Sequence, residues 1–185
     1  MEATDILRKE HRAIENVLDS IVRAADAVKA GRQVPPQVFA DGLDFIRNFA
    51  DRCHHTKEEG RLFPLFGERG LPMQGGPIQV MLIEHEEGRK HVREAALQYD
   101  RWAAGDSSAG AAMADALRSY AALLRDHIFK EDNILYPMGD RLITEADDQM
   151  LVKQFDDIEE HELGPGVHEK YHAMIERLEE ETARL

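Results

Sequence analysis

The chain has 185 residues, which is enough for one well-filled core and too short for two ordinary domains with a linker. Its 36 acidic residues outnumber 23 basic ones, and a formal net charge of -13 would repel both nucleic acid and anionic lipid. No apolar run has the length of a membrane span, and the first residues lack the features of a secretory signal. We therefore expect a cytoplasmic protein that does not bind nucleic acid or membrane.

Apolar residues recur at helical spacing along the first third of the chain, and no stretch alternates at the period of a strand. The first predicted helix spans residues 5–30 and carries His11 on its apolar face. The second spans residues 36–60, with proline in its first turn, and its apolar stripe continues into His54 and Glu58. The apolar face of the first helix thus contains a histidine, and that of the second helix ends in a histidine and a glutamate.

The middle of the chain follows the same pattern. A third helix is predicted over residues 77–104 and places His85 among apolar neighbours, and a fourth over residues 108–133 does the same for His127. The Pro- and Gly-rich segment 62–76 is predicted to cross one end of the helices. Each of the four helices therefore directs one histidine inward.

The last part of the chain predicts two further helices. One covers residues 144–161, and the Gly-Pro-Gly sequence at 164–166 separates it from an amphipathic helix that reaches Leu185. The fold class predicted for the whole chain is all-α. We expect an up-down four-helix bundle over residues 1–140, with residues 141–185 as a helical extension packed on it.

A repeated pattern of histidine and glutamate runs through the four bundle helices. A lone histidine is followed on the next helix by a His-x-x-x-Glu pair, and the pattern occurs twice. Its members are His11, His54 and Glu58 in the first copy, and His85, His127 and Glu131 in the second. The flanks also agree, because KEEGRLFP follows the first pair where KEDNILYP follows the second. These four imidazoles and two carboxylates are a ligand set for two metal ions.

Helical geometry and electrostatics support this interpretation. Residues four apart lie on one helix face, about 5–6 Å from each other, so each His-x-x-x-Glu pair can chelate an ion. Histidines in such positions can also be ordinary core residues, but a carboxylate on an apolar face needs a counter-charge, which a metal supplies. Imidazole with carboxylate suits iron or manganese, with zinc possible, and the lack of thiolate argues against copper(I) or iron-sulfur chemistry.

The order H, HxxxE, H, HxxxE, with HHTKEEGRLFP and HIFKEDNILYP around the pairs, resembles the bacterial hemerythrin-like (HHE cation-binding) family over about residues 5–140. The resemblance implies a non-haem centre of two iron ions with an oxo or hydroxo bridge, held by the six residues named above. Oxygen-carrying hemerythrins have another histidine where this chain has Arg89, and a more widely spaced aspartate in place of Glu131. A more open iron centre favours reaction with nitric oxide, peroxide or dioxygen over reversible oxygen storage.

Three functions follow from this interpretation. The first is a di-iron protein that binds or reacts with a small diatomic or peroxide ligand, in stress response, sensing or iron handling. The second is a redox enzyme that turns over peroxide or nitric oxide, which includes the repair of damaged iron-sulfur centres. The order of the six ligands is similar to that of di-iron proteins implicated in such repair. The third is an interaction module in which the metal only holds the helices together.

Several residues near the predicted ligands are expected to have supporting roles. Arg89 and Glu15 lie one turn from His85 and His11, where they can line the pocket or orient ligands. Tyr99 and Tyr120 lie close to the core faces and are expected to pack there, although either could control access to the metals.

Three further side chains are predicted to stay outside the ligand set. Cys53 neighbours His54 and could offer a thiolate, but the repeat has Asp126 in its place, so an ordinary semi-buried thiol is expected. His55 points about 100° away from His54 on an α-helix, and His91 lies off the face of His85. Both histidines are expected at the surface or behind the ligands.

The motif H-E-x-x-H begins at His168 and matches the signature of zinc metalloproteases. No histidine follows His172 to complete such a site, and no strand is predicted that could bind a peptide substrate. A solvated helix face is the preferred interpretation, with an accessory metal site formed by His161, His168 and His172 as the alternative.

Overall fold

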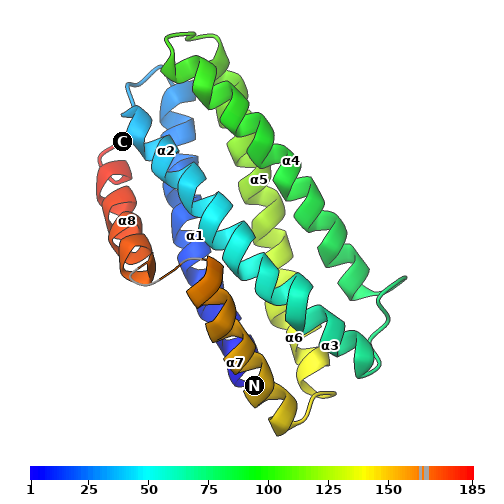
Figure 1. Cartoon of the computed structure of the whole chain (residues 1–185). Coiled ribbons are helices and arrows are strands. Elements are labelled where there is room, and N and C mark those ends of the chain that lie inside the picture. Colours follow the sequence, from blue (N-terminus) through cyan, green and yellow to red (C-terminus); the bar gives the residue numbers. More distant parts are fainter. Residues whose placement is uncertain (163, 165–166) are drawn as a thin grey trace.

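The computed structural model describes residues 1–162, 164 and 167–185, and every regular element in these ranges is helical. This confirms the predicted all-α class. Figure 1 shows long helices lying side by side, with two further helices along one flank. None of the described helices combines the length and the apolar character that crossing a membrane requires.

Four helical rods form the bundle, and two of them contain π-helical segments. The first rod is α1 (Glu2–Lys29), and the third is α4 (Pro77–Ala103). The second consists of α2 (Pro36–Phe45), η1 (Ile46–His55), η2 (Glu58–Leu62) and α3 (Phe63–Glu68). The fourth consists of α5 (Ala109–Lys130), η3 (Glu131–Leu135) and α6 (Tyr136–Asp140).

The second and fourth rods are longer than predicted. The sequence pattern ends them near residues 60 and 133, whereas helix continues to Glu68 and Asp140. The expectation was wrong because Pro64 and Pro137 each lie in the first turn of a new α-helix after a π-helical segment, where a missing N–H is harmless. The crossing between the second and third rods is correspondingly shorter.

A polar layer divides the hydrophobic core into two clusters. One cluster includes Ile14, Phe45 and Leu117, and the other, nearer the chain's N-terminus, includes Leu7 and Phe66. Along α1, His11 lies between Leu7 of one cluster and Ile14 of the other. The interior between the clusters is filled by buried histidine and glutamate side chains, so the candidate site lies inside the bundle.

The two C-terminal helices, α7 (Glu145–Glu162) and α8 (Val167–Thr182), contact the bundle through α1. A capping box begins α7, since the amide of Thr144 donates to Asp147 at 2.9 Å and the amide of Asp147 donates to the Thr144 hydroxyl at 3.2 Å. Asp148 in turn accepts from the amides of Glu2 and Ala3 at 2.9 and 3.0 Å. The first turn of α7 therefore caps the N-terminus of α1.

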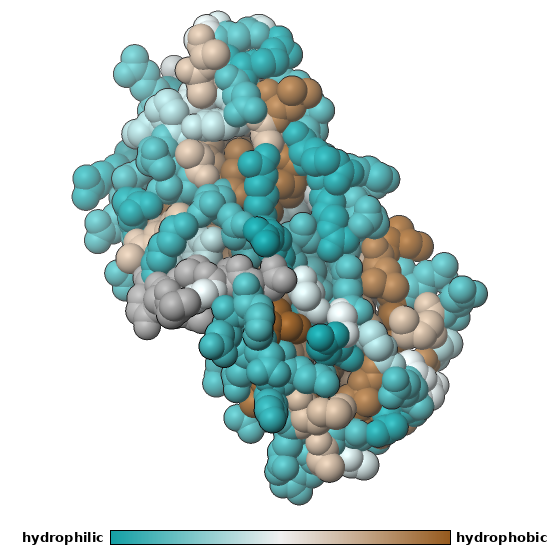
Figure 2. Space-filling view, viewed as in Figure 1, coloured by the Kyte–Doolittle hydropathy of each residue, from teal (hydrophilic) through white to brown (hydrophobic). Residues whose placement is uncertain are grey.

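The face of the molecule drawn in Figure 2 is largely hydrophilic, with separate hydrophobic patches. This agrees with the excess of acidic residues in the sequence. Charged side chains gather on the outside, so the buried charged layer inside the bundle needs a separate explanation.

Candidate metal centre

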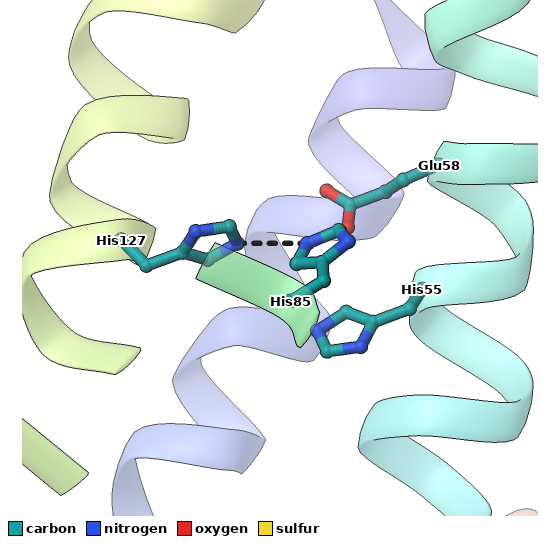
Figure 3. Close-up of side chains that lie close together, drawn as sticks. All are labelled: His55, Glu58, His85 and His127. Atoms are coloured by element: carbon teal, nitrogen blue, oxygen red, sulfur yellow. Dashed lines mark hydrogen bonds and ion pairs between the residues drawn. The ribbon is translucent and has the colours of Figure 1, made fainter. Parts of the chain in front are cut away.

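All six predicted site residues lie together in the buried polar layer, and the structure adds a seventh, His55. They form two groups of four, and the potential ligand atoms of each group lie within 4.8 Å of one another. The first group is His11, His54, Glu58 and Glu131, and the second is His55, Glu58, His85 and His127. Figure 3 shows the second group. Glu58 belongs to both groups, so the two groups of potential ligands meet at this carboxylate.

The position of His55 corrects the sequence interpretation. An α-helical wheel directs it away from His54, but η1 is π-helical, and the wider i→i+5 turn changes the angle between neighbouring side chains. The His55 ring is buried and stacks on the ring of His85, with centroids 3.8 Å apart. The only sequence feature that points to His55 as a potential ligand is its place next to His54. Regular α-helical geometry, which the sequence pattern predicts, directs the two side chains apart.

The two glutamates each lie between imidazoles from different rods. Glu58 places Oε1 3.6 Å from Nε2 of His54 and Oε2 3.4 Å from Nε2 of His85. Glu131 places Oε2 3.3 Å from Nε2 of His11 and 3.2 Å from Nε2 of His127. Each carboxylate therefore lies between a histidine of the first group and a histidine of the second group.

Several atoms of this cluster are buried without a hydrogen-bond partner. These are Nε2 of His11, Oε2 of Glu58 and both carboxylate oxygens of Glu131. Nε2 of His85 and Nε2 of His127 face each other at 2.9 Å (Figure 3). Buried polar atoms are normally satisfied, so the unpartnered atoms of Glu58, Glu131 and His11 fit cations placed among them.

The outer nitrogen of every clustered histidine meets a carboxylate. The Nδ1 contacts are His11 with Asp132 at 2.8 Å, His54 with Glu10 at 2.7 Å, His55 with Asp51 at 3.2 Å, His85 with Glu59 at 2.6 Å and His127 with Glu84 at 3.0 Å. An imidazole that donates its Nδ1–H outward presents the Nε2 lone pair inward. This is the usual orientation for metal-binding histidines.

A third layer of cations holds these carboxylates. Lys57 pairs with Glu10 and Lys130 pairs with Glu84. Arg12 pairs with Asp132, and Arg89 contacts both Asp51 and Glu59 at 2.8 Å. These contacts fix the carboxylates in position, and contacts with the cations and the histidines lower the pKa of Glu10, Asp51, Glu59 and Glu84.

The layers explain the flanks of the sequence repeat. Glu10 and Glu84 precede the lone histidines, yet each serves the paired histidine and the lysine of the following rod. The acidic residue after each pair serves the other copy of the repeat, because Glu59 contacts His85 and Asp132 contacts His11. The two halves of the bundle therefore exchange supporting groups.

His54, His55 and His85 are neutral at pH 7. Burial, together with neighbouring imidazoles, lowers the pKa of His54 and of His55 to about 4 and that of His85 to about 3. Burial raises the pKa of Glu58, and the charge of Glu131 raises it further. Neutral imidazoles are ready to bind a metal without first losing a proton.

His11 and His127 behave differently. Burial alone would lower both pKa values, but contacts with Asp132 and Glu131 raise the pKa of His11, and Glu131 and Glu84 raise that of His127 to about 9. At neutral pH the metal-free protein therefore carries a second ring proton on His127, and a bound cation would have to displace it.

Metal affinity is consequently expected to rise with pH. Each proton displaced costs about tenfold in apparent affinity for every pH unit below the pKa of its group, so Mn²⁺ should bind more tightly from pH 6.5 to pH 8. Titration of the metal-free protein in buffers of different ionisation enthalpy measures both affinity and proton release. An affinity that is constant over this range, without proton release, would contradict the protonation of His127 in the metal-free protein.

The aromatic neighbours differ between the two halves. The ring of Tyr136 lies parallel to that of His11, 5.7 Å away, and Phe63 lies similarly against His85 at 6.1 Å. Only Tyr136 has a hydroxyl, which donates to Oε1 of Glu58. The phenol fixes the shared glutamate from one side.

The supporting residues predicted from the sequence separate into two kinds. Arg89 holds carboxylates behind the cluster, whereas Glu15 pairs with Arg12. Tyr120 is buried in the core and Tyr99 packs against it. Cys53 is more deeply buried than expected, lies in neither four-residue group, and has its pKa raised by burial to about 12.

The remaining histidines lie away from the described clusters. His91 is half-buried, with Nε2 3.9 Å from Glu87. His161 and His172 are exposed, and the side chain of His168 falls outside the described residues. Neither described group of potential metal ligands includes a C-terminal histidine.

A helical bundle with two groups of buried histidines and carboxylates that share one glutamate defines a class of metal-binding bundle proteins. Comparison with known families agrees: the hemerythrin HHE cation binding domain matches residues 2–139. The chain belongs to this family. It is also 22% identical over 162 residues to the uncharacterized proteins Mb2018 of Mycobacterium bovis and Rv1995 of Mycobacterium tuberculosis. The match covers 88% of this chain and 63% of each relative, so the chain spans less than two thirds of their length.

Proposed function

We propose that this protein holds two iron ions and binds or reacts with dioxygen, nitric oxide or peroxide, in stress response, sensing or iron handling. The observation that carries the proposal is the pair of four-residue groups that share Glu58. The proposed ligands are the six residues of the repeat, His11, His54, Glu58, His85, His127 and Glu131, together with His55. Zinc or manganese could occupy the same donors.

Each part of the chain has a separate task in this proposal. An iron pair, when bound, supplies electron transfer and coordination positions that four protein ligands leave open. Neutral imidazoles and two carboxylates hold the ions, and the outer carboxylates keep each ring in its tautomer and orientation. The apolar clusters above and below the polar layer keep bulk water away from it.

The test is the metal content and ultraviolet-visible spectrum of protein purified from iron-supplemented cells, before and after addition of azide. About two irons per chain, with an absorption band in the 330 to 380 nm region that family resemblance predicts, would support the proposal, as would a spectral shift with azide. Zinc alone, or no metal, would contradict the iron assignment. Iron without any response to azide or nitric oxide would favour a purely structural metal.

A further inference from the structure

A cavity of about 140 Å³ lies between η1, α4 and α5 and ends at the imidazoles of His55 and His85. Ile46, Tyr120 and Leu124 form part of its wall, and all three are buried apolar or aromatic residues. A cavity of about 150 Å³ holds a molecule the size of benzene, or roughly six non-hydrogen atoms. The space is larger than dioxygen, nitric oxide or hydrogen peroxide needs.

Gly88 contributes to this space because it has no side chain to fill it. It lies inside the long helix α4, where glycine is less favourable than any residue except proline, and it lines the cavity. A Cβ atom at Gly88 would lie 3.4 Å from the ring of Tyr120, an ordinary contact distance. Alanine would therefore fit, so close helix packing does not require the glycine.

Three arginines and two carboxylates, Asp51 and Glu84, line the cavity, so arginines are in excess over carboxylates. Arg47 and Arg93 both line it and are exposed, and no ion pair of either is found among the described residues. Arg89 also lines the cavity, but Asp51 and Glu59 already neutralise it. In a chain of net charge -13, two arginines without carboxylate partners at one cavity favour an anionic ligand.

We propose that this cavity binds a short organic anion, with a compact apolar body against Ile46, Tyr120 and Leu124 and its charged group at Arg47 and Arg93. The ligand lies beside the group formed by His55, Glu58, His85 and His127. This inference deepens the proposed function, on which it rests, by naming the class of molecule that reaches the ions. Ligands of this size enter on the His55 side of the site, while Tyr136 covers the His11 side.

The probe is pivalate, which joins a tert-butyl group to a carboxylate, and its neutral counterpart is pivalamide. Calorimetric titration of the purified protein should give a dissociation constant on the order of 1 mM for pivalate. Pivalamide should bind about tenfold more weakly, because it lacks the charge-assisted hydrogen bonds. Chelator-treated protein, measured in the same way, should retain pivalate binding, since the cavity and the arginines do not depend on the ions.

Variants locate the binding. Arg47→Gln and Arg93→Gln should each weaken pivalate binding about tenfold, whereas Arg141→Gln, at an exposed arginine away from the cavity, should leave it unchanged. Gly88→Leu should fill the cavity and abolish binding, with Gly88→Ala as the control for a side chain at this helix position. The arginine variants lie at the surface and keep the test decisive if Gly88→Leu fails to fold.

Three results would overturn the inference: no pivalate binding, equal binding of pivalamide, or binding that the Arg47, Arg93 and Gly88 variants leave unchanged. Binding that requires the metal and ignores these variants would mean simple coordination of the carboxylate to an ion. Metal content is measured separately for each protein. Loss of the predicted anion binding is thus distinguishable from absence of the proposed iron.

Discussion

Glu58→Ala is expected to remove both metal ions, whereas His55→Ala removes or weakens only one. Glu58 is the residue common to both groups, and its two oxygens approach His54 and His85 on opposite sides. Losing an outer partner of a ligand already costs about 10–100-fold in metal affinity, so losing a shared ligand should cost more at each position. Metal analysis after dialysis measures the stoichiometry, and circular dichroism checks that the chain stays helical.

The matched control is Glu15→Ala, because Glu15 is one turn from His11 on the same helix and pairs with Arg12 instead. His54→Ala and Glu131→Ala should also lose metal while the protein stays helical. Two ions retained by Glu58→Ala would show that the carboxylate is not shared. Equal losses in Glu58→Ala and His55→Ala would show that the two positions fill only together.

Removal of the metal is expected to lower the melting temperature by roughly 10–20 °C. A ligand at one hundred times its dissociation constant stabilises a protein by about 2.7 kcal/mol, so two ions contribute about 5 kcal/mol. For a chain of this size, each kcal/mol corresponds to about 2–4 °C. Differential scanning calorimetry of the protein before and after chelation measures the shift.

The physical cause is the charge of the layer that divides the core. Glu58 and Glu131 are fully buried; without cations, contacts with His11 and His127 lower the pKa of Glu131, and the Tyr136 hydroxyl donates to Glu58. Re-addition of Mn²⁺ or iron should restore the original transition. Mg²⁺, which prefers oxygen ligands, should not restore it and serves as the control. An unchanged melting temperature after complete metal removal would contradict a stabilising role for the ions.

The cross-exchange of supporting groups bears on how the two halves of the bundle depend on each other. Glu59 of the first copy orients His85 of the second, and Asp132 of the second orients His11 of the first. Neither copy of the repeat completes its own histidines. An ion bound in either group would therefore restrain side chains from both halves of the bundle.

The C-terminal helices reach the same network from outside. Glu159 of α7 pairs with the buried Lys57, which pairs with Glu10 behind His54. The first turn of α7 also caps α1, the helix that carries His11. The helical extension is thus connected to the metal centre through charged groups as well as through apolar packing.

The sequence by itself determined the helical class, the four bundle helices and the six-residue pattern, because helical periodicity and the histidine and glutamate repeat are local features of the chain. The capping box of Thr144 and Asp147 at the start of α7 is likewise a local feature of the chain. The local pattern places the ends of two rods too early, because it does not show that Pro64 and Pro137 lie in the first turns of new α-helices after π-helical segments.

Only the tertiary structure decided the place of His55, the outer layers and the cavity. A helical wheel assumes a fixed angle between neighbours, and the i→i+5 turns of η1 change that angle and bring His55 beside His85. Which carboxylate meets which imidazole depends on contacts between helices distant in sequence, and so does the space beside Gly88. Local patterns carry no information about those distances, because they are set by how the four rods pack against one another.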